Sequence, residues 1–186
     1  KLKGAGNTAA ALATPRMTNE ELSLLKQLMT QQVGSDNIDH SAGYGHAALT
    51  EGLAKSFGVA AAPATILDIQ KSDLLLVIKS DAYETHPVVG FEINMAVKNK
   101  GASLQIISDK RGKLGKLPKA STLLHKPGTE VALLNAIAKV LIDENLAGAA
   151  ASVAGYAELV AGLTAFAPEQ VAAQCGVSAE SIRELA

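Results

Sequence analysis

Two short apolar runs lie in the middle of the chain, with an amphipathic segment between them. The runs are Leu74–Ile78 and Leu104–Ile107, and the segment between them starts at Pro87 and keeps apolar residues at helical spacing until Gly101. Continuous apolar runs of this length are typical of strands buried on both faces, and proline suits the first position of a helix. The pattern therefore predicts a βαβ unit with two parallel strands.

Amphipathic helices are predicted on both sides of this unit. Thr18 and Glu21 have the spacing of a capping box, and the helix that follows them can end at Gly34. Residues 34–46 are rich in glycine, histidine and polar residues, which predicts a loop before a helix over residues 47–57. Further along, we expect a third short strand at Leu123 and Leu124, a helix from Thr129 to about Glu144, and helices throughout from Ala149 onward.

The order of these elements predicts an α/β fold, in which a Rossmann-like parallel sheet is flanked by helices and followed by a helical C-terminal tail. We expect residues 1–34 to form an N-terminal segment and first helix of a neighbouring subdomain, residues 35–148 the Rossmann-like domain, and residues 149–186 a truncated helical segment. The chain starts without methionine and its last helical pattern stops at Ala186, which indicates a fragment of a larger multidomain subunit. Residues 9–13 fit either a buried strand or an irregular edge.

The composition disfavours several classes of function. There are 17 Lys and Arg residues against 18 Asp and Glu, so a net charge of −1 provides no general attraction to nucleic acid or to an anionic membrane. The apolar runs are shorter than the roughly 20 residues that a membrane span needs. The single cysteine, Cys175, excludes a disulfide framework or an iron–sulfur cluster held by these residues alone, and its apolar neighbours predict an inert core thiol. We therefore expect a cytoplasmic protein with no nucleic-acid partner and no direct membrane insertion.

Polar residues follow each predicted strand, where the carboxyl ends of parallel strands meet. These segments are Lys79–Pro87, Ser108–Arg111 and Lys126–Glu130. They fit a nucleotide cleft, and they equally fit the ordinary polar ends of any doubly wound domain. Residues 110–119 hold five basic residues and no acidic one, which fits either a solvated loop or a phosphate contact.

Histidines are the remaining candidates for chemistry. Asp39, His40 and His46 form the only cluster of metal-ligand types, and they fit polar loop caps, an independent metal site or a remnant beside a lost cofactor. His86 fits either the start of a helix or a proton relay. His125 is expected at a strand end that faces solvent or a partner domain.

Five collinear segments resemble the central part of the molybdopterin oxidoreductase superfamily. They are Thr14–Leu28, Asp36–Gly58, Asp68–Gly90, Lys126–Leu146 and Gly155–Ala186. The nearest branches are the formate dehydrogenase alpha subunit and the G-type subunit of NADH-quinone oxidoreductase. The resemblance implies that an iron–sulfur region lies amino-terminal to this piece and that a barrel domain follows it.

Members of this superfamily bind molybdopterin guanine dinucleotide, and the active ones place a cysteine or selenocysteine metal ligand directly before a histidine. The histidine here is His46, but the ligand position is Gly45, which has no side chain to donate. The resemblance therefore implies no catalytic residue and no protein ligand for a metal in this chain.

The strand-end loops of the family hold the phosphates and the guanine of that cofactor. In the first loop, the family's glycine is Lys79 and its asparagine is Asp81, a carboxylate that repels phosphate. In the second loop, the family's acid aligns with Ser108, or with Asp109 after a shift of one residue, and its proline is missing. In the third loop, Glu130 would receive the hydrogens of the guanine ring. The cofactor-binding positions implied in this way are Ser80, Asp81, His86, Pro87, Ser108, Asp109, Lys110, Gly128, Thr129 and Glu130.

The favoured hypothesis is the central domain of a G-type subunit of NADH-quinone oxidoreductase, a scaffold of the electron-transfer arm that has lost its molybdenum ligand. This fragment would then bind no cofactor and be non-catalytic by itself, with iron–sulfur clusters in the missing N-terminal region. Its partners would be the other subunits of a respiratory NADH dehydrogenase complex and the remaining domains of its own chain, which place it peripheral to the inner membrane. The alternative is a fragment of a formate dehydrogenase alpha-like subunit that still binds molybdopterin guanine dinucleotide. A third hypothesis is a nucleotide- or small-anion-binding module outside electron transfer.

Overall fold

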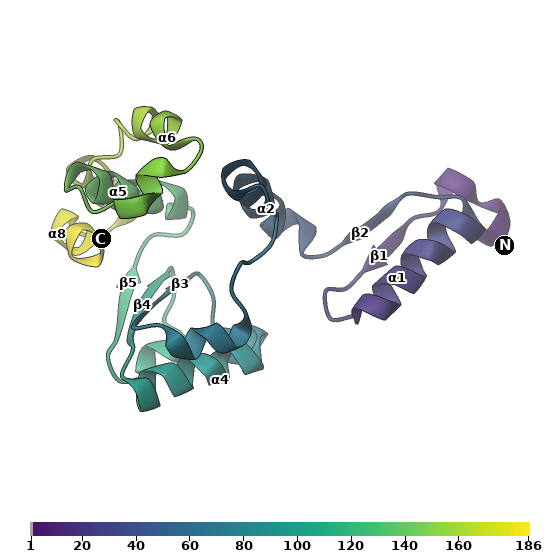
Figure 1. The fold of residues 1–186 in the computed structure, drawn as a ribbon, viewed down its shortest axis with the longest axis horizontal. Helices are drawn as coiled ribbons and strands as arrows, with labels where there is room; N and C mark the ends of the chain where they lie inside the picture. Colours follow the sequence, from purple (N-terminus) through teal and green to yellow (C-terminus); the bar gives the residue numbers. More distant parts are fainter. Residues whose placement is uncertain (1) are drawn as a thin grey trace. The chain divides into compact units, whose positions relative to one another are not determined.

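The computed structural model describes residues 2–186 and, apart from Tyr44, the side chains among them. The chain forms two compact units, one up to residue 61 and one over residues 62–186, and each is described by itself (Figure 1). Among residues 2–186, no helix is long and apolar enough to cross a membrane.

The first unit contains a pair of short parallel strands and a helix between them in sequence. Strand β1 (Ala11–Ala13) pairs with β2 (Ile38–His40). Helix α1 (Asn19–Gln27) connects them and continues as a π-helical segment, Leu28–Val33. The predicted capping box at its start is confirmed, since Glu21 N–H donates to Thr18 Oγ1 at 3.2 Å and Thr18 N–H donates to Glu21 Oε2 at 2.8 Å. Short 3₁₀ turns at Leu2–Gly4 and Gly6–Thr8 precede β1.

The loop predicted over residues 34–46 is wrong in part. It contains β2, and helix α2 (Gly43–Phe57) begins four residues before the predicted start at residue 47. A three-residue strand is too short to show a hydrophobic period, and long-range bonds fix its position instead. Ser35 is 1% exposed, donates its hydroxyl hydrogen to Ala9 O at 2.7 Å and accepts from Asn37 N–H at 3.2 Å.

The second unit is built on a three-stranded parallel sheet, which confirms the predicted α/β fold. The strands are β3 (Leu74–Ile78), β4 (Ser103–Ser108) and β5 (Ala120–Leu124), in the order β3-β4-β5. A 3₁₀ segment, Ile66–Lys71, precedes β3. Between β3 and β4 the chain forms α3 (Ala82–Thr85), then α4 (Pro87–Met95), which continues as a π-helical segment, Ala96–Lys100. Pro87 occupies the first position of α4, as predicted.

The core of this unit lies on both faces of the sheet because side chains alternate along β4. Leu104 and Ile106 pack with Ile93 and Val97 of the α4 segment. Ile107 points the other way and packs with buried residues of α5 (Glu130–Asp143). Figure 1 shows α4 along one side of the sheet and α5 beyond its other side.

Helices complete the chain, as the sequence predicts for its tail. They are α6 (Tyr156–Gly162), α7 (Pro168–Cys175) and α8 (Ala179–Leu185), and 3₁₀ turns occur at Leu114–Lys116 and Gly148–Ser152. Helices α7 and α8 pack on α5, and Cys175 is 0% exposed in that core, as expected for a structural thiol. The domain boundaries at residues 34 and 148 stay predictions.

One expectation about the sheet is wrong. Strand β3 is not buried on both faces, because Leu74, Leu76 and Ile78 are 60%, 50% and 41% exposed. These three side chains lie on the face opposite to Leu75 and Val77, which pack against the α4 side of the core. On the face that carries Leu74, Leu76 and Ile78, helix α5 covers β4 and β5 through Ile107 and Leu123. Helix α5 does not extend over β3, so these three side chains stay exposed in this unit.

Candidate functional site

Because the three strands are parallel, the residues that follow them meet at one edge of the sheet. Lys79 follows β3, Asp109 follows β4, and His125 follows β5. The Lys79 N–H donates to Ile107 O at 2.7 Å and the His125 N–H donates to Ser108 O at 3.1 Å, so the ladder bonds extend one residue past the strands. The polar residues that follow the three strands therefore lie together at one edge of the sheet, as predicted.

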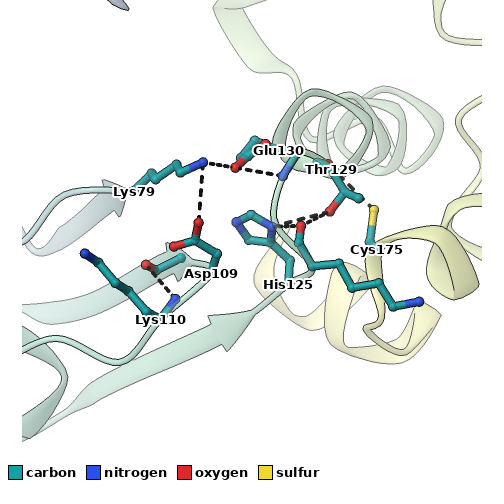
Figure 2. A network of polar contacts seen from close by, with 10 residues as sticks. Lys79, Asp109, Lys110, His125, Thr129, Glu130 and Cys175 are labelled. Atoms are coloured by element: carbon teal, nitrogen blue, oxygen red, sulfur yellow. Dashed lines mark hydrogen bonds and ion pairs between the residues drawn. The ribbon is translucent and has the colours of Figure 1, made fainter.

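Lys79 links these strand ends through its ammonium group (Figure 2). Its Nζ donates a hydrogen bond to Glu130 Oε1 and lies 3.5 Å from Asp109 Oδ2. The same Glu130 oxygen also accepts from the Gly128 N–H at 3.3 Å. Lys79 has a backbone φ of +49°, which is the left-handed region that favours glycine, so its conformation agrees with the glycine expected there by resemblance.

The ion pair shifts the titration of both partners. The hydrogen bond from Lys79 lowers the pKa of Glu130 to about 2, with a further contribution from backbone N–H groups. The hydrogen bond to Glu130 in turn raises the pKa of Lys79, and the charge of Asp109 adds to that shift. Both groups are therefore charged across the neutral range.

Asp81 has a structural task that sequence analysis missed. Its carboxylate accepts from Tyr83 N–H at 3.3 Å at the start of α3, and from Lys113 N–H at 2.6 Å. A Cβ at Gly112 would lie 2.5 Å from Asp81 Oδ2, so any side chain there would force the carboxylate to move. The carboxylate therefore ties the loop after β3 to the basic loop after β4, and no local pattern signals a bond between residues 32 positions apart.

His125 is buried, which corrects the expectation that it faces solvent or a partner. The residue is 5% exposed, and its Nδ1 lies 2.8 Å from Lys126 O. A carbonyl only accepts, so in the neutral ring Nδ1 carries the hydrogen and Nε2 carries a lone pair. Within residues 2–186, Nε2 has no hydrogen-bond partner. Thr129 closes this turn by donating its hydroxyl hydrogen to Lys126 O at 2.7 Å.

A pocket of about 490 Å³ opens beside these groups, between the loops that follow β3 and β4. Its walls include five basic residues, Lys79, Lys110, Arg111, Lys113 and Lys116, and three acidic ones, Asp81, Glu84 and Asp109. In the part of the chain that the structure describes, Lys110, Arg111 and Lys116 form no ion pair. Such cations at the carboxyl ends of parallel strands suit an anionic ligand.

Only some of the predicted positions line this pocket. Ser80, Asp81, Ser108, Asp109 and Lys110 do, and Ser108 is buried with its hydroxyl oxygen accepting from Lys110 N–H at 3.3 Å. Gly128, Thr129 and Glu130 lie outside its walls, after β5, and Glu130 accepts the hydrogen bond from Lys79. His86 and Pro87 are exposed and do not line it. His86 Nδ1 lies 2.9 Å from Thr85 Oγ1, and the residue precedes α4, which agrees with the start of a helix.

The first unit holds the positions implied for the metal. Gly45 lies near the start of α2, and a Cβ placed on it would have no atom within 4 Å. His46 is exposed, and Asp39 Oδ1 accepts from the His40 N–H at 2.7 Å, a local contact of the kind expected for polar caps. Among the described residues, no group of three His, Cys, Asp or Glu side chains could hold a metal ion.

The two ends of the cofactor that the resemblance implies fit these residues differently. The basic pocket suits a ligand with phosphates. The Nε2 of His125 is buried outside the walls of that pocket and has no hydrogen-bond partner among the described residues. The metal end finds no sulfur or nitrogen donor at Gly45. The residues present therefore fit the dinucleotide and do not provide a thiolate for the metal.

Comparison with known proteins finds relatives over most of this chain. The family model for molybdopterin oxidoreductases matches residues 1–160. The F420-dependent formate dehydrogenase subunit alpha of Methanocaldococcus jannaschii is 33% identical over 177 residues, which are 94% of this chain and 26% of that protein. The NADPH-Fe(3+) oxidoreductase subunit alpha of Geobacter sulfurreducens is 30% identical over 183 residues, 97% of this chain and 22% of that protein. The chain thus spans about a quarter of the length of these relatives.

A solved structure supports the fold. Acetylene hydratase from Pelobacter acetylenicus superposes with a TM-score of 0.73 at 22% identity, over 95% of this chain and 24% of that one. The family model and the sequence relatives confirm the resemblance to the molybdopterin oxidoreductase superfamily and to formate dehydrogenase alpha subunits.

Proposed function

This chain belongs to the molybdopterin oxidoreductase family, and from that premise we propose that it is the central domain of an alpha subunit similar to those of formate dehydrogenases. In that subunit it binds the dinucleotide end of molybdopterin guanine dinucleotide. The observation that carries the proposal is the pocket at the ends of β3 and β4. Its Lys110, Arg111 and Lys116 form no ion pair with any described residue. The relatives named as formate dehydrogenase alpha subunits support this alternative better than the G-type subunit of NADH-quinone oxidoreductase.

The residues of the pocket have separate tasks in this proposal. Lys110 and Arg111 neutralise the phosphates, and the Arg111 guanidinium can hold two phosphate oxygens at once. The side chains of Ser108 and Asp81 hold the loops in place by accepting hydrogen bonds from the backbone N–H groups of Lys110 and Lys113. When bound, the cofactor supplies the metal-centred redox chemistry, and this domain supplies binding and orientation.

The nucleotide content of the full-length subunit tests the proposal. Acid hydrolysis of the cofactor's pyrophosphate releases GMP, so protein from a host that makes the cofactor should yield about one GMP per subunit. The double variant Lys110→Ser with Arg111→Ser should retain about tenfold less, because two phosphate contacts are lost. The matched control is Lys98→Ser with Lys100→Ser, which removes the same charge from exposed residues at the other end of β4 and should retain all of it.

Two results would overturn the proposal: no GMP in the wild-type subunit, or equal loss from the two double variants. Formate-dependent dye reduction by the same preparation tests the finer assignment to formate oxidation. That activity should fall in step with GMP content.

A second candidate is the scaffold role in an NADH-quinone oxidoreductase, supported by Gly45 and by the pairing of Lys79 with Glu130. In that case the other subunits of a respiratory complex are the partners and the clusters elsewhere in the chain carry the electrons. Metal analysis separates the two candidates. About one molybdenum or tungsten per full-length subunit contradicts the scaffold, whereas absence of both metal and GMP from a subunit that copurifies with NADH oxidation supports it.

A further inference from the structure

Two lysines of this unit share an uncommon backbone conformation but use their charges differently. Lys79 and Lys119 have φ values of +49° and +57°, in a region that costs residues with a Cβ free energy relative to glycine. The Lys119 ammonium donates to a backbone carbonyl, Gly101 O, at 2.9 Å. The Lys79 ammonium instead reaches two carboxylates from other loops, Asp109 and Glu130. The position of Lys79 therefore merits a functional explanation.

The groups that surround the Lys79 ammonium are hydrogen-bond acceptors. The side chains of Asp109 and Glu130 are each 19% exposed, and ionised carboxylates only accept. His125 adds a third acceptor, since its buried Nε2 has a lone pair and no partner among the described residues. In Figure 2 this nitrogen points toward the side on which Lys79 and Asp109 lie. Such a set of acceptors calls for a ligand rich in N–H donors.

We infer that Lys79 is a tethered counterion that occupies the base end of the nucleotide site until a nucleobase with N–H donors, such as guanine, displaces it. This inference rests on the proposed function. Guanine's ring and amino hydrogens can satisfy the same acceptors, so base and ammonium compete for them. Lys79 also lines the pocket beside Lys110 and Arg111, so the displaced ammonium could pair with the phosphates of the ligand bound there.

With competition of this kind, removing the Lys79 ammonium changes the affinity for the base and the affinity for the phosphates in opposite directions. A site whose acceptors are already occupied binds the base more weakly, in proportion to the fraction of time that it is free. Removing the ammonium should strengthen binding of a base without phosphates. It should weaken binding of a phosphate group without a base, because one of five pocket cations is lost.

The test uses the full-length subunit from a host that does not make the pterin, with guanosine and inorganic pyrophosphate as separate probes in calorimetric titrations. Lys79→Gly keeps the left-handed backbone, and Lys79→Asn is a second neutral variant that tolerates it. For both variants we expect the Kd of guanosine to fall about fivefold or more and that of pyrophosphate to rise severalfold. The matched control is Lys119→Gly, which relieves the same backbone conformation and removes the same charge, and it should change neither Kd.

Guanosine binding that is unchanged or weaker in both Lys79 variants overturns the inference, as does a failure of any of these proteins to bind guanosine. An equal change in Lys119→Gly overturns it as well, because charge alone would then explain the result. The proposed function is judged separately by the GMP content of the protein from a cofactor-making host. A wild-type protein that contains GMP, with no effect of Lys79 on guanosine, would leave that function standing and end the role of Lys79.

Discussion

The two units of this chain differ in how much they bury and in what their polar ends offer. Residues 62–186 have a core on both faces of a sheet, and the ends of their strands carry ion pairs and a basic pocket. Residues 2–61 contain two strands of only three residues each. In this unit the buried residues among those described are Ala13, Met29, Val33 and Ser35. At the position implied for a metal ligand, that unit has the glycine Gly45. Charge and packing thus concentrate in the unit to which we assign nucleotide binding.

Under the proposed function, this difference means that one end of a cofactor site is kept while the other end has changed. Buried cores hold loops at fixed positions, so strand-end groups stay preorganised even where individual residues are replaced. A ligand position on the exposed side of a helix such as α2 has no such support, and replacement by glycine there disturbs no packing. The comparison leads to predictions that separate the units.

The largest effect is expected from Leu133→Ala in the core of the second unit. Leu133 is 0% exposed, and loss of its buried methyl groups together with the cavity left behind should cost about 2–5 kcal/mol. Leu12→Ala in the first unit should stay within about 0.5 kcal/mol, since Leu12 is 77% exposed. Hydrogen exchange of β4 and β1 amides in the full-length subunit measures each local unfolding free energy. Equal effects would contradict the difference in packing between the units.

A smaller effect is expected from Gly45→Cys in the first unit. The new Cβ meets open space, and replacing a helical glycine should stabilise α2 by about 0.3 kcal/mol. The added thiol should react with a maleimide within minutes, whereas Cys175, at 0% exposure, should stay unlabelled in the folded subunit. Peptide mapping by mass spectrometry identifies the labelled residue. A protected thiol at position 45 would show that this part of α2 is covered in the full-length subunit.

The smallest effect is a pH dependence of stability from the pair of Lys79 and Glu130. The folded pKa of Glu130 is about 2, below its usual 4.5, so its contribution is present above about pH 4.5 and is lost as pH falls toward 2. The pKa of Lys79 is raised, so its contribution is complete below its usual 10.5 and is lost as pH rises through the higher folded value. The stability difference between wild type and Lys79→Met should therefore be constant from about pH 5 to about pH 9 and shrink in acid. Thermal unfolding at a series of pH values measures it, and a constant difference down to about pH 2 would contradict the pairing.

Much of the fold could be predicted from local patterns. The capping box at Thr18, the proline that starts α4 and the apolar runs of β3 and β4 each signal their element within a few residues. Two strands joined by one helix imply parallel pairing, so the meeting of strand ends followed as well. The α/β fold was predictable for that reason.

Features that depend on distant partners could not be predicted. Strand β2 is defined by its pairing with β1, and Asp81 by the N–H of Lys113. An apolar run also does not show what will cover it, which is why the exposed face of β3 was expected to be buried.

The uncovered face of β3 has a practical consequence. Strand β3 is an edge strand, and Leu74, Leu76 and Ile78 present an apolar stripe next to its unpaired backbone groups. A polypeptide made of these residues alone would offer other copies a template for strand addition, and self-association through that edge is the expected result in concentrated solution. Laboratory production of these residues alone should therefore benefit from charged substitutions on this stripe, such as Leu76→Lys.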